Sequence, residues 1–307
     1  GLVGISYETA IKATDKGEMM RAFDERRIEH PWFYILDSID TLAQIREKIT
    51  YPCICKPTDN AGSRGVILIN SETELSSGVK YSSAHGRKGS VIIEEYMLGS
   101  EVSVEIIVCN GVPNVLAVTD KLTTGAPHFV EMGHSQPSII AENDVDKIKD
   151  LACRAVKAIG IENGPAHVEI MLAEDGPKII ELGARLGGDC ITSHLVPLST
   201  GIDMVKSAIQ VALGETPDIS PKFSKGAAIR YFDVRQGQIK AITGVEDAQS
   251  IEGVQEITLM KQVGDRVDSI DSSVDRIGFV ITQNDDAYKA IANCEETMKH
   301  ICIKTQQ

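Results

Sequence analysis

Two glutamates, Glu169 and Glu181, have the spacing of a two-carboxylate cation site. They lie on the two strands of a hairpin that apolar runs and a Glu-Asp-Gly turn predict for residues 166–183. Counting outward from the turn places them roughly opposite each other, with about 5–6 Å between their Cα atoms. Facing carboxylates repel unless a cation lies between them, and Mg²⁺ bound by carboxylates and nucleotide phosphates would remove that repulsion. Arg185 follows closely and would stabilise negative charge on a transferring phosphoryl group. The alternative is that one glutamate turns outward to solvent.

A lysine at the end of a second predicted strand is followed by a loop that can fold over phosphates. Lys56 ends the strand at 53–56, and the loop at 57–65 reads PTDNAGSRG. The loop positions suited to contact a triphosphate are Asn60, Gly62, Ser63, Arg64 and Gly65. Glycines let backbone N–H groups approach phosphate oxygens, and lysine and arginine add positive charge. The P-loop spacing is absent, so an ordinary glycine-rich surface loop is the alternative.

A third candidate is the acidic end of the strand predicted at 91–97. The acidic residues that end this strand could offer a carboxylate to an adenine amino group while the strand backbone pairs with the ring edge. Glu101, seven residues after Glu94 and beyond a Gly-Ser turn, would meet a pair of ribose hydroxyls. A solvated acidic strand end is the alternative for both.

Composition excludes several classes of partner. The formal net charge is −13 and the pI is about 5.0, which disfavours nucleic acid and anionic membrane surfaces. No run of about 18 apolar residues predicts a membrane span, and the N-terminal residues do not resemble a signal peptide. The seven cysteines are scattered, and Cys53 and Cys55 point to one face of a strand. Core thiols in a reducing, cytoplasmic location are therefore expected, with metal or redox use as the alternative.

Taken in the order in which they occur along the chain, the three elements resemble the ATP-grasp superfamily of carboxylate–amine and carboxylate–thiol ligases. The resemblance rests on Asp15-Lys16, on YPCICKPTDNAGSRGV at 51–66, on VIIEEYMLGSEVSVE at 91–105 and on HVEIMLAEDGPKIIELGARLGGD at 167–189. Within the superfamily the chain looks most like the L-amino-acid ligase branch, which is related to carbamoyl-phosphate synthases. The resemblance implies an α+β ATP-grasp fold, in which two α+β lobes clasp ATP, with a small β-rich C-terminal lobe.

The resemblance also implies how ATP is bound. Lys16 and Lys56 would contact its phosphates, and the loop at 60–65 would close over them. The residues implied around the adenosine are Glu94, Glu95, Met97 and Glu101. Lys56 would act as a catalytic residue as well as a nucleotide ligand.

For the metal, the resemblance implies that Glu169 and Glu181 bind one or two Mg²⁺ ions, with Mn²⁺ as a substitute. Arg185 would stabilise the acyl-phosphate step and contact the substrate. Many members of the superfamily carry asparagine two residues after the second metal glutamate, and this chain has Gly183 there. The ligand set of a second metal ion is therefore left open.

The implied reaction is ADP-forming: a substrate carboxylate becomes an acyl phosphate, which an amine then attacks. The stretch HFVEMGHSQPS at 128–138 resembles the branch that joins amino acids, and there Glu131 and His134 would face the amino-acid substrate. An ordinary loop histidine is the alternative for His134. Two other functions stay open, a nucleotide-binding module without turnover and a bicarbonate-activating enzyme. The partners are then small-molecule carboxylates and amines, and a homodimer is left open.

These side chains must be positioned by alternating helices and strands. Helices are expected at about 14–29, 40–49, 72–85, 144–160 and 286–300, and residues 120–137 are expected to form a loop. The expected domains are a helical part at 1–50, a small lobe with the phosphate loop at 51–98, a large lobe with the metal site at 99–221 and a separate β-rich lobe at 222–307. Superfamily members generally carry a further α/β lobe before the first helix, and the chain is expected to lack it.

Overall fold

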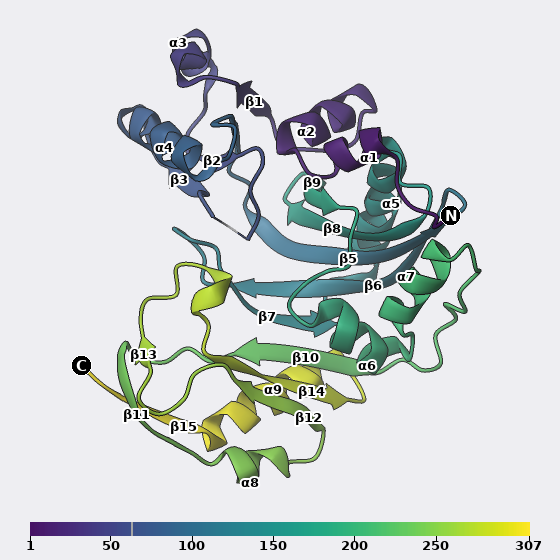
Figure 1. The fold of residues 1–307 in the computed structure, drawn as a ribbon, viewed down its shortest axis with the longest axis vertical. Coiled ribbons are helices and arrows are strands. Elements are labelled where there is room, and N and C mark those ends of the chain that lie inside the picture. Colours follow the sequence, from purple (N-terminus) through teal and green to yellow (C-terminus); the bar gives the residue numbers. More distant parts are fainter. Residues whose placement is uncertain (63) are drawn as a thin grey trace.

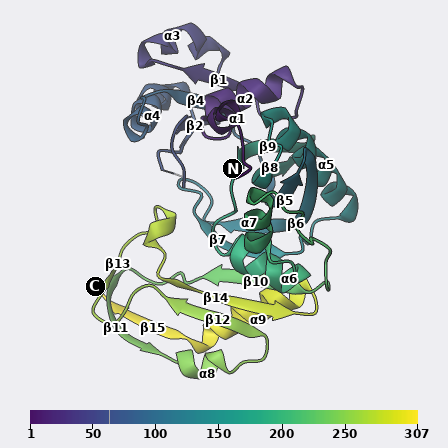
Figure 2. The ribbon, with the colours of Figure 1, turned by 45° about the vertical axis from the view of Figure 1, so that its right-hand side comes forward.

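A computed structural model describes residues 1–62 and 64–307 (Figure 1). Across these two ranges the strands form three sheets, with four, eight and three strands. The four-stranded sheet and the three-stranded sheet lie at opposite ends of the molecule, and the large sheet lies between them (Figure 2). None of the helices in the described ranges combines the length and hydropathy that a membrane crossing requires.

The four-stranded sheet has the order β1-β4-β2-β3. Its strands are β1 (Phe33–Leu36), β2 (Cys53–Pro57), β3 (Ile67–Ile69) and β4 (Val91–Glu95). Cys53 and Cys55 are fully buried in one core, beneath α4 (Glu72–His85), and burial raises the pKa of the thiols to about 11 and about 12. The prediction of core thiols on one face of the strand is confirmed. Alternation then turns Ile54 and Lys56 to the opposite face, toward the large sheet.

The prediction that residues 1–50 are helical is wrong in part. Strand β1 lies in this range and pairs antiparallel with β4, so that Phe33 is opposite Glu94. The expected helix at 40–49 is a chain of short turns, namely η1 (Ile39–Thr41), α3 (Leu42–Ile45) and η2 (Arg46–Lys48). The other helices here are α1 (Tyr7–Lys12) and α2 (Lys16–Glu25), and Asp15 caps α2 by accepting from the N–H groups of Gly17 and Glu18.

The large sheet has the order β12-β14-β10-β7-β6-β5-β8-β9, and its recorded pairings are antiparallel. Its central strands are β5 (Gly99–Cys109), β6 (Val112–Thr123), β7 (Glu131–Gln136), β8 (Gly164–Ala173) and β9 (Gly176–Gly183). Asn110 and Gly111 join β5 to β6 with φ of 52° and 76°, the positive pair that a tight hairpin turn requires. The loop expected at 120–137 is instead the end of β6, a short connection and all of β7.

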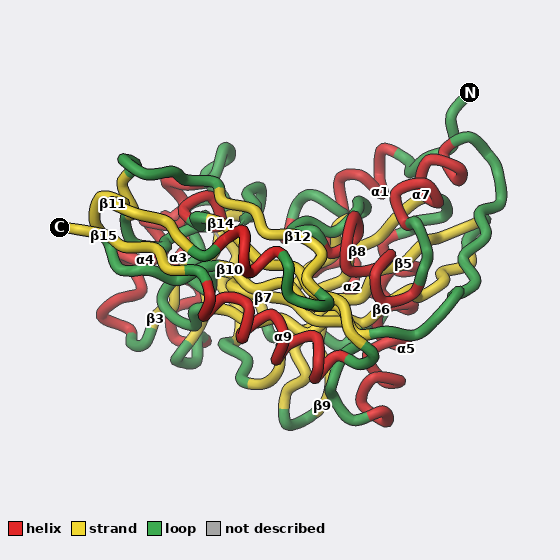
Figure 3. Tube along the Cα trace, turned by 90° about the horizontal axis from the view of Figure 1, so that it is seen from below, coloured by secondary structure: helices red, strands yellow, loops and turns green. Residues whose placement is uncertain are grey.

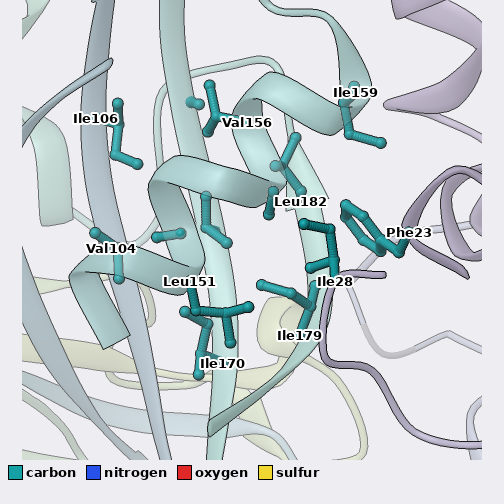
Figure 4. Close-up of a cluster of buried hydrophobic side chains, with 14 of the residues drawn as sticks. Phe23, Ile28, Val104, Ile106, Leu151, Val156, Ile159, Ile170, Ile179 and Leu182 are labelled. Atoms are coloured by element: carbon teal, nitrogen blue, oxygen red, sulfur yellow. The ribbon is translucent and has the colours of Figure 1, made fainter. Parts of the chain in front are cut away.

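One face of the large sheet is apolar and covered by helices. Strand residues such as Val104, Ile170 and Leu182 pack on Leu151 of α5 (Glu142–Ile159) and on Phe23 of α2 (Figure 4). Helix α5 ends at Gly160 in the left-handed region, as its glycine predicts. Because neighbouring side chains on a strand alternate between faces, this packing turns the intervening polar residues of β5, β8 and β9 to the other face.

The C-terminal range both extends the large sheet and forms a small sheet of its own, around a separate hydrophobic core. Strands β10 (Gly226–Tyr231), β12 (Val254–Leu259) and β14 (Gly278–Asn284) extend the large sheet through the pairing of β10 with β7. The third sheet contains β11 (Gly237–Thr243), β13 (Arg266–Val267) and β15 (Cys302–Gln306).

Helix α9 (Ala287–His300) packs on β10 and β14 (Figure 3), and η4 is at Ser273–Asp275. The remaining helices are the π-helix at Ile191–Leu195, α6 (Val196–Thr200), α7 (Met204–Ala212) and α8 (Val245–Gln249). The boundaries drawn at 50, 98 and 221 stay predictions.

Candidate functional site

A cavity lies between the four-stranded sheet and the polar face of the large sheet. It encloses about 1070 Å³ when its open mouth is included. Strands β2, β4, β5, β6, β8 and β9 contribute to its wall, together with the N-terminus of α2 and the loop after β2. Nearly all of the site residues expected from the sequence line it.

One end of the cavity combines an apolar wall with a buried ion pair. The wall includes Ile54, Val66, Met97, Met171 and Ile180, with Glu95 and Tyr96 beside them. Lys56 Nζ lies 2.6 Å from Glu94 Oε2, and both side chains are buried. Burial alone would lower the pKa of Lys56, but the carboxylates of Glu94, Glu181 and Glu169 together outweigh it and the pKa is raised. Within the described residues Glu94 Oε1 is buried without a hydrogen-bond partner, so it is an acceptor available to an amino group on a planar ligand.

The loop after β2 lines the cavity and is linked through Lys16 to Glu181. Lys16 Nζ, at the N-terminus of α2, donates to the Asn60 carbonyl at 2.7 Å and to Glu181 Oε1 at 3.0 Å. Gly62 and Arg64 also line the cavity, and Gly62 has a φ of +67° that suits glycine. The prediction for Ser63 lies outside the described residues. A lysine, an arginine and backbone groups therefore face the place where a polyphosphate would lie.

Glu169 and Glu181 are cross-strand partners on β8 and β9, as predicted. Their pairing depends on a bulge, because Ile170 pairs with Ile179 and an unbroken ladder would put Ile180 opposite Glu169. The register shifts at this point, so Glu181 takes that place and points into the cavity with Glu169. Without the bulge, alternation would send Glu181 to the opposite face.

The donor set around these two carboxylates fits Mg²⁺. In residues 1–62 and 64–307, no group of three or more His, Cys, Asp and Glu side chains is arranged to hold a metal ion on its own. Mg²⁺ is commonly bound through one or two carboxylates, with phosphate oxygens and water as the other ligands. Glu169 and Glu181 supply two hard oxygen donors beside a phosphate-sized space, and that is the composition such a site needs.

Lys121 of β6 was missed by sequence reasoning. Its side chain is 4% exposed and forms ion pairs with Glu101, with Glu169 at 3.0 Å and with Glu131 at 3.8 Å. Burial would lower the pKa of Lys121, but Glu169, Glu101 and Glu131 together raise it well above its ordinary value. The residue lies in the range expected to be a loop. Reading VTDKLT at 118–123 as a strand, in which side chains alternate between faces, would have predicted that Lys121 points inward.

A buried ion pair between His167 and Glu105 lies next to Glu169. His167 Nδ1 lies 2.8 Å from Glu105 Oε1, and His167 Nε2 lies 3.4 Å from Glu169 Oε1. Burial would lower the pKa of His167, but Glu105 and Glu169 together outweigh it and raise the pKa to about 10. Burial would raise the pKa of Glu169, but Lys121 and His167 hold it well below its ordinary range. Glu169 is thus held ionised between two cationic side chains.

The His167 pair predicts a pH-dependent contribution to stability. His167 titrates at about 6.5 when unfolded and at about 10 when folded, so its contribution is complete below pH 6.5 and is lost as pH rises through 10. We expect His167→Gln to lower the free energy of unfolding, and the difference from wild type to shrink as the pH is raised across this window. Urea denaturation at several pH values measures it, with the exposed His300→Gln as control. A difference that stays constant with pH would contradict the assignment.

Glu131 and His134, the two residues predicted to face the amino-acid substrate, lie in different surroundings. Glu131 lines the cavity, whereas His134 is buried, with Nε2 3.3 Å from Asp189 Oδ2, and does not belong to the lining. Asp189 also accepts two 2.7 Å hydrogen bonds from Arg276, whose Nη1 donates to the Glu131 carbonyl. The substrate contact expected of His134 stays a prediction. Pairing with the Asp189–Arg276 ion pair holds the imidazole behind the wall.

Arg185 lies at the cavity mouth, beyond the second metal glutamate. Its side chain is exposed, and Nη1 donates to the Leu186 carbonyl at 2.9 Å. A Cβ added at Gly183 would lie 3.1 Å from Arg185 Cγ and 3.2 Å from Nε. The arginine stem therefore occupies the space that a side chain at position 183 would take. This packing gives a physical reason for the glycine that departs from the superfamily pattern.

Comparisons with known proteins agree with this geometry. Residues 49–193 match the ATP-grasp domain family, and residues 230–306 match L-amino acid ligase C-terminal domain 2. An uncharacterized protein, y4rH of Sinorhizobium fredii, is 28% identical over 80% of this chain and 52% of its own length. The L-arginine-specific L-amino acid ligase of Bacillus subtilis is 26% identical over 97% of this chain and 74% of its own length. The crystal structure of L-amino acid ligase from Bacillus licheniformis superposes with a TM-score of 0.85 at 24% identity, covering 99% of this chain and 75% of that one.

Proposed function

The chain belongs to the ATP-grasp superfamily, and on that premise we propose that it is an ADP-forming ligase that activates a carboxylate for attack by an amine. The observation that carries the proposal is the cavity-facing pair Glu169 and Glu181, set beside Lys16 and beneath the loop at 57–65. The relatives suggest the substrate class, because two of them are named for amino acids, an L-arginine-specific L-amino acid ligase and an alanine–anticapsin ligase.

The proposed reaction has two steps. An oxygen of the substrate carboxylate attacks the γ-phosphorus of ATP, the bond to the β-phosphate oxygen breaks, and ADP leaves with the electron pair. The amine nitrogen then attacks the acyl carbon, inorganic phosphate leaves, and the nitrogen loses a proton to give the amide. Mg²⁺ held by Glu169, Glu181 and phosphate oxygens would offset the phosphate charge and orient the transferred group.

The chain's own cations have separate proposed roles in these steps. Lys56 and Lys16 neutralise phosphate charge from fixed, buried positions, which costs little reorganisation when the ligand binds. Arg185 is exposed at the mouth and stabilises charge on the transferring phosphoryl group. Glu94 Oε1 accepts from the adenine amino group, and Glu101 binds the ribose. The loop at 57–65 excludes water from the acyl phosphate.

Several finer points belong to this proposal. Mn²⁺ substitutes for Mg²⁺, since the same oxygen ligands suit both ions. The location is cytoplasmic, supported by seven cysteines that are all free, with Cys53 and Cys55 buried. The partners are a small carboxylate and a small amine. A homodimer is the assembly proposed.

An ADP-release assay with a panel of amino-acid pairs tests the function. Wild type is expected to release ADP only when Mg²⁺, ATP and a suitable pair are present, and Glu181→Gln is expected to lower the rate by about 100-fold or more. A second arm supplies bicarbonate without an amino acid. ADP release in that arm alone would replace the amino-acid assignment by bicarbonate activation. A Glu181→Gln variant that binds Mg²⁺·ATP as well as wild type would overturn the metal role.

A further inference from the structure

The carboxylates of the cavity are each neutralised by a lysine of the chain itself. Lys56 pairs with Glu94, Lys16 pairs with Glu181, and Lys121 pairs with three carboxylates. Lysines with long, flexible stems normally extend to solvent, and burying an ammonium is costly unless it is paired. These three are 7%, 7% and 4% exposed along their side chains, so they are buried parts of the cavity wall.

The Lys121 ammonium lies among three carboxylates, and each carboxylate has a different proposed task. Glu101 is assigned to the ribose, Glu131 to the substrate and Glu169 to the metal. The Lys121 ammonium contacts each of them, and the strand that carries it is held on both sides, since Asp120 pairs with Val102 of β5 and Lys121 with His134 of β7. The backbone beneath the ammonium is therefore fixed, and only its side chain can change partners.

Both oxygens of Glu169 are already in use. Oε2 lies 3.0 Å from Lys121 Nζ, and Oε1 lies 3.4 Å from His167 Nε2. A divalent cation that takes Glu169 as a ligand would lie close to one of these two positively charged groups, and the repulsion between like charges favours displacement of that group. His167 is held from behind by Glu105 at 2.8 Å, whereas Lys121 has two further carboxylates to turn to. Lys121 is the contact that can leave at lower cost.

We propose that Lys121 is a built-in counter-ion that the divalent cation displaces from Glu169, so that metal loading is an exchange of one cation for another. This inference rests on the proposed function, because it takes Glu169 as a metal ligand. After the exchange the ammonium stays with Glu101 and Glu131. The lysine keeps the carboxylates from repelling each other before metal binds, and by competing it weakens metal binding in the absence of nucleotide.

Mn²⁺ binding without nucleotide tests the exchange. If Lys121 competes with the metal ion, removing it tightens Mn²⁺ binding; if Lys121 supports the metal site, removing it weakens Mn²⁺ binding. Free Mn²⁺ is measured by electron paramagnetic resonance during titration of wild type and Lys121→Met. Removing the competitor is expected to tighten Mn²⁺ binding by about tenfold, a modest share of the coupling found for close charge pairs. The matched Lys121→Arg keeps the charge and is expected to bind Mn²⁺ within about threefold of wild type. Unchanged or weaker binding in Lys121→Met would overturn the proposal.

A second variant keeps the test decisive if Lys121→Met does not fold without metal. The double variant Lys121→Met with Glu101→Gln removes one charge of each sign, so the net charge of the cluster is preserved. It is expected to fold, as followed by thermal unfolding, and to show the same tightening. If wild type binds no Mn²⁺ even with ATP present, the metal site itself fails. If wild type binds Mn²⁺·ATP but neither variant binds Mn²⁺ more tightly, only the exchange fails.

Discussion

Replacing Arg185 with methionine is expected to lower the rate of ADP formation by about 10²–10³-fold, the loss typical for one group that stabilises transition-state charge. Its guanidinium is exposed at the cavity mouth and spends one N–H on the Leu186 carbonyl, so its other donors remain able to reach a transferring phosphoryl group. Mg²⁺·ATP binding is expected to change by less than about threefold, because the buried Lys16 and Lys56 contact the ground-state phosphates in the proposal. Single-turnover ADP formation and nucleotide titration measure the two quantities separately.

Two controls separate charge from position in this test. Arg185→Lys keeps the charge and loses the planar fork, so it is expected to recover only part of the rate. Gly183→Ala keeps the arginine but adds a Cβ 3.1 Å from its Cγ, so the exposed stem must shift by a few tenths of an ångström and a smaller loss of rate than in Arg185→Met is expected. An Arg185→Met variant that forms ADP at the wild-type rate would remove this residue from the chemistry.

The Glu169–Glu181 pair illustrates what sequence reasoning can reach. A Glu-Asp-Gly turn between two apolar runs defines a hairpin, and the hairpin limits which residues face each other. The bulge at Ile180 was beyond its reach, yet it decides the face to which Glu181 points. Bulges depend on how a strand fits the twist of its neighbours, and that fit is a property of the assembled sheet.

Contacts between residues far apart in the sequence could not be predicted from local sequence patterns. Lys121 meets Glu169, 48 residues away, and Arg276 meets Asp189, 87 residues away. Each ion pair depends on which strands become neighbours in the large sheet. The pairing of β10 with β7 is of the same kind, since it joins the C-terminal range to the sheet that carries the cavity. Composition showed that 222–307 is rich in strands, but period and propensity do not say which sheet a strand will join.

Lys56→Met is expected to destabilise the fold by about 3–5 kcal/mol, the cost of leaving one member of a buried ion pair without its partner. Lys56 and Glu94 lie on neighbouring strands, 2.6 Å apart, and their residues are 5% and 4% exposed. Glu94 Oε1 already has no hydrogen-bond partner within the described residues, so removal of Lys56 would leave both carboxylate oxygens buried and unsatisfied. Urea denaturation at neutral pH measures the loss, and a nucleotide titration is expected to show ATP binding lost with it.

The double variant Lys56→Met with Glu94→Gln decides whether the loss comes from the orphaned charge. With no buried carboxylate left unpaired, it is expected to regain more than half of the stability that the single variant loses. ATP binding is expected to stay impaired, because both the phosphate contact and the charged adenine acceptor are gone. The exposed Lys80→Met of α4 is a matched surface control and is expected to change stability by less than about 0.5 kcal/mol. Equal losses in the single and double variants would mean that the loss does not come from an unpaired Glu94 carboxylate, because only the ion-pair account predicts recovery when the carboxylate is neutralised.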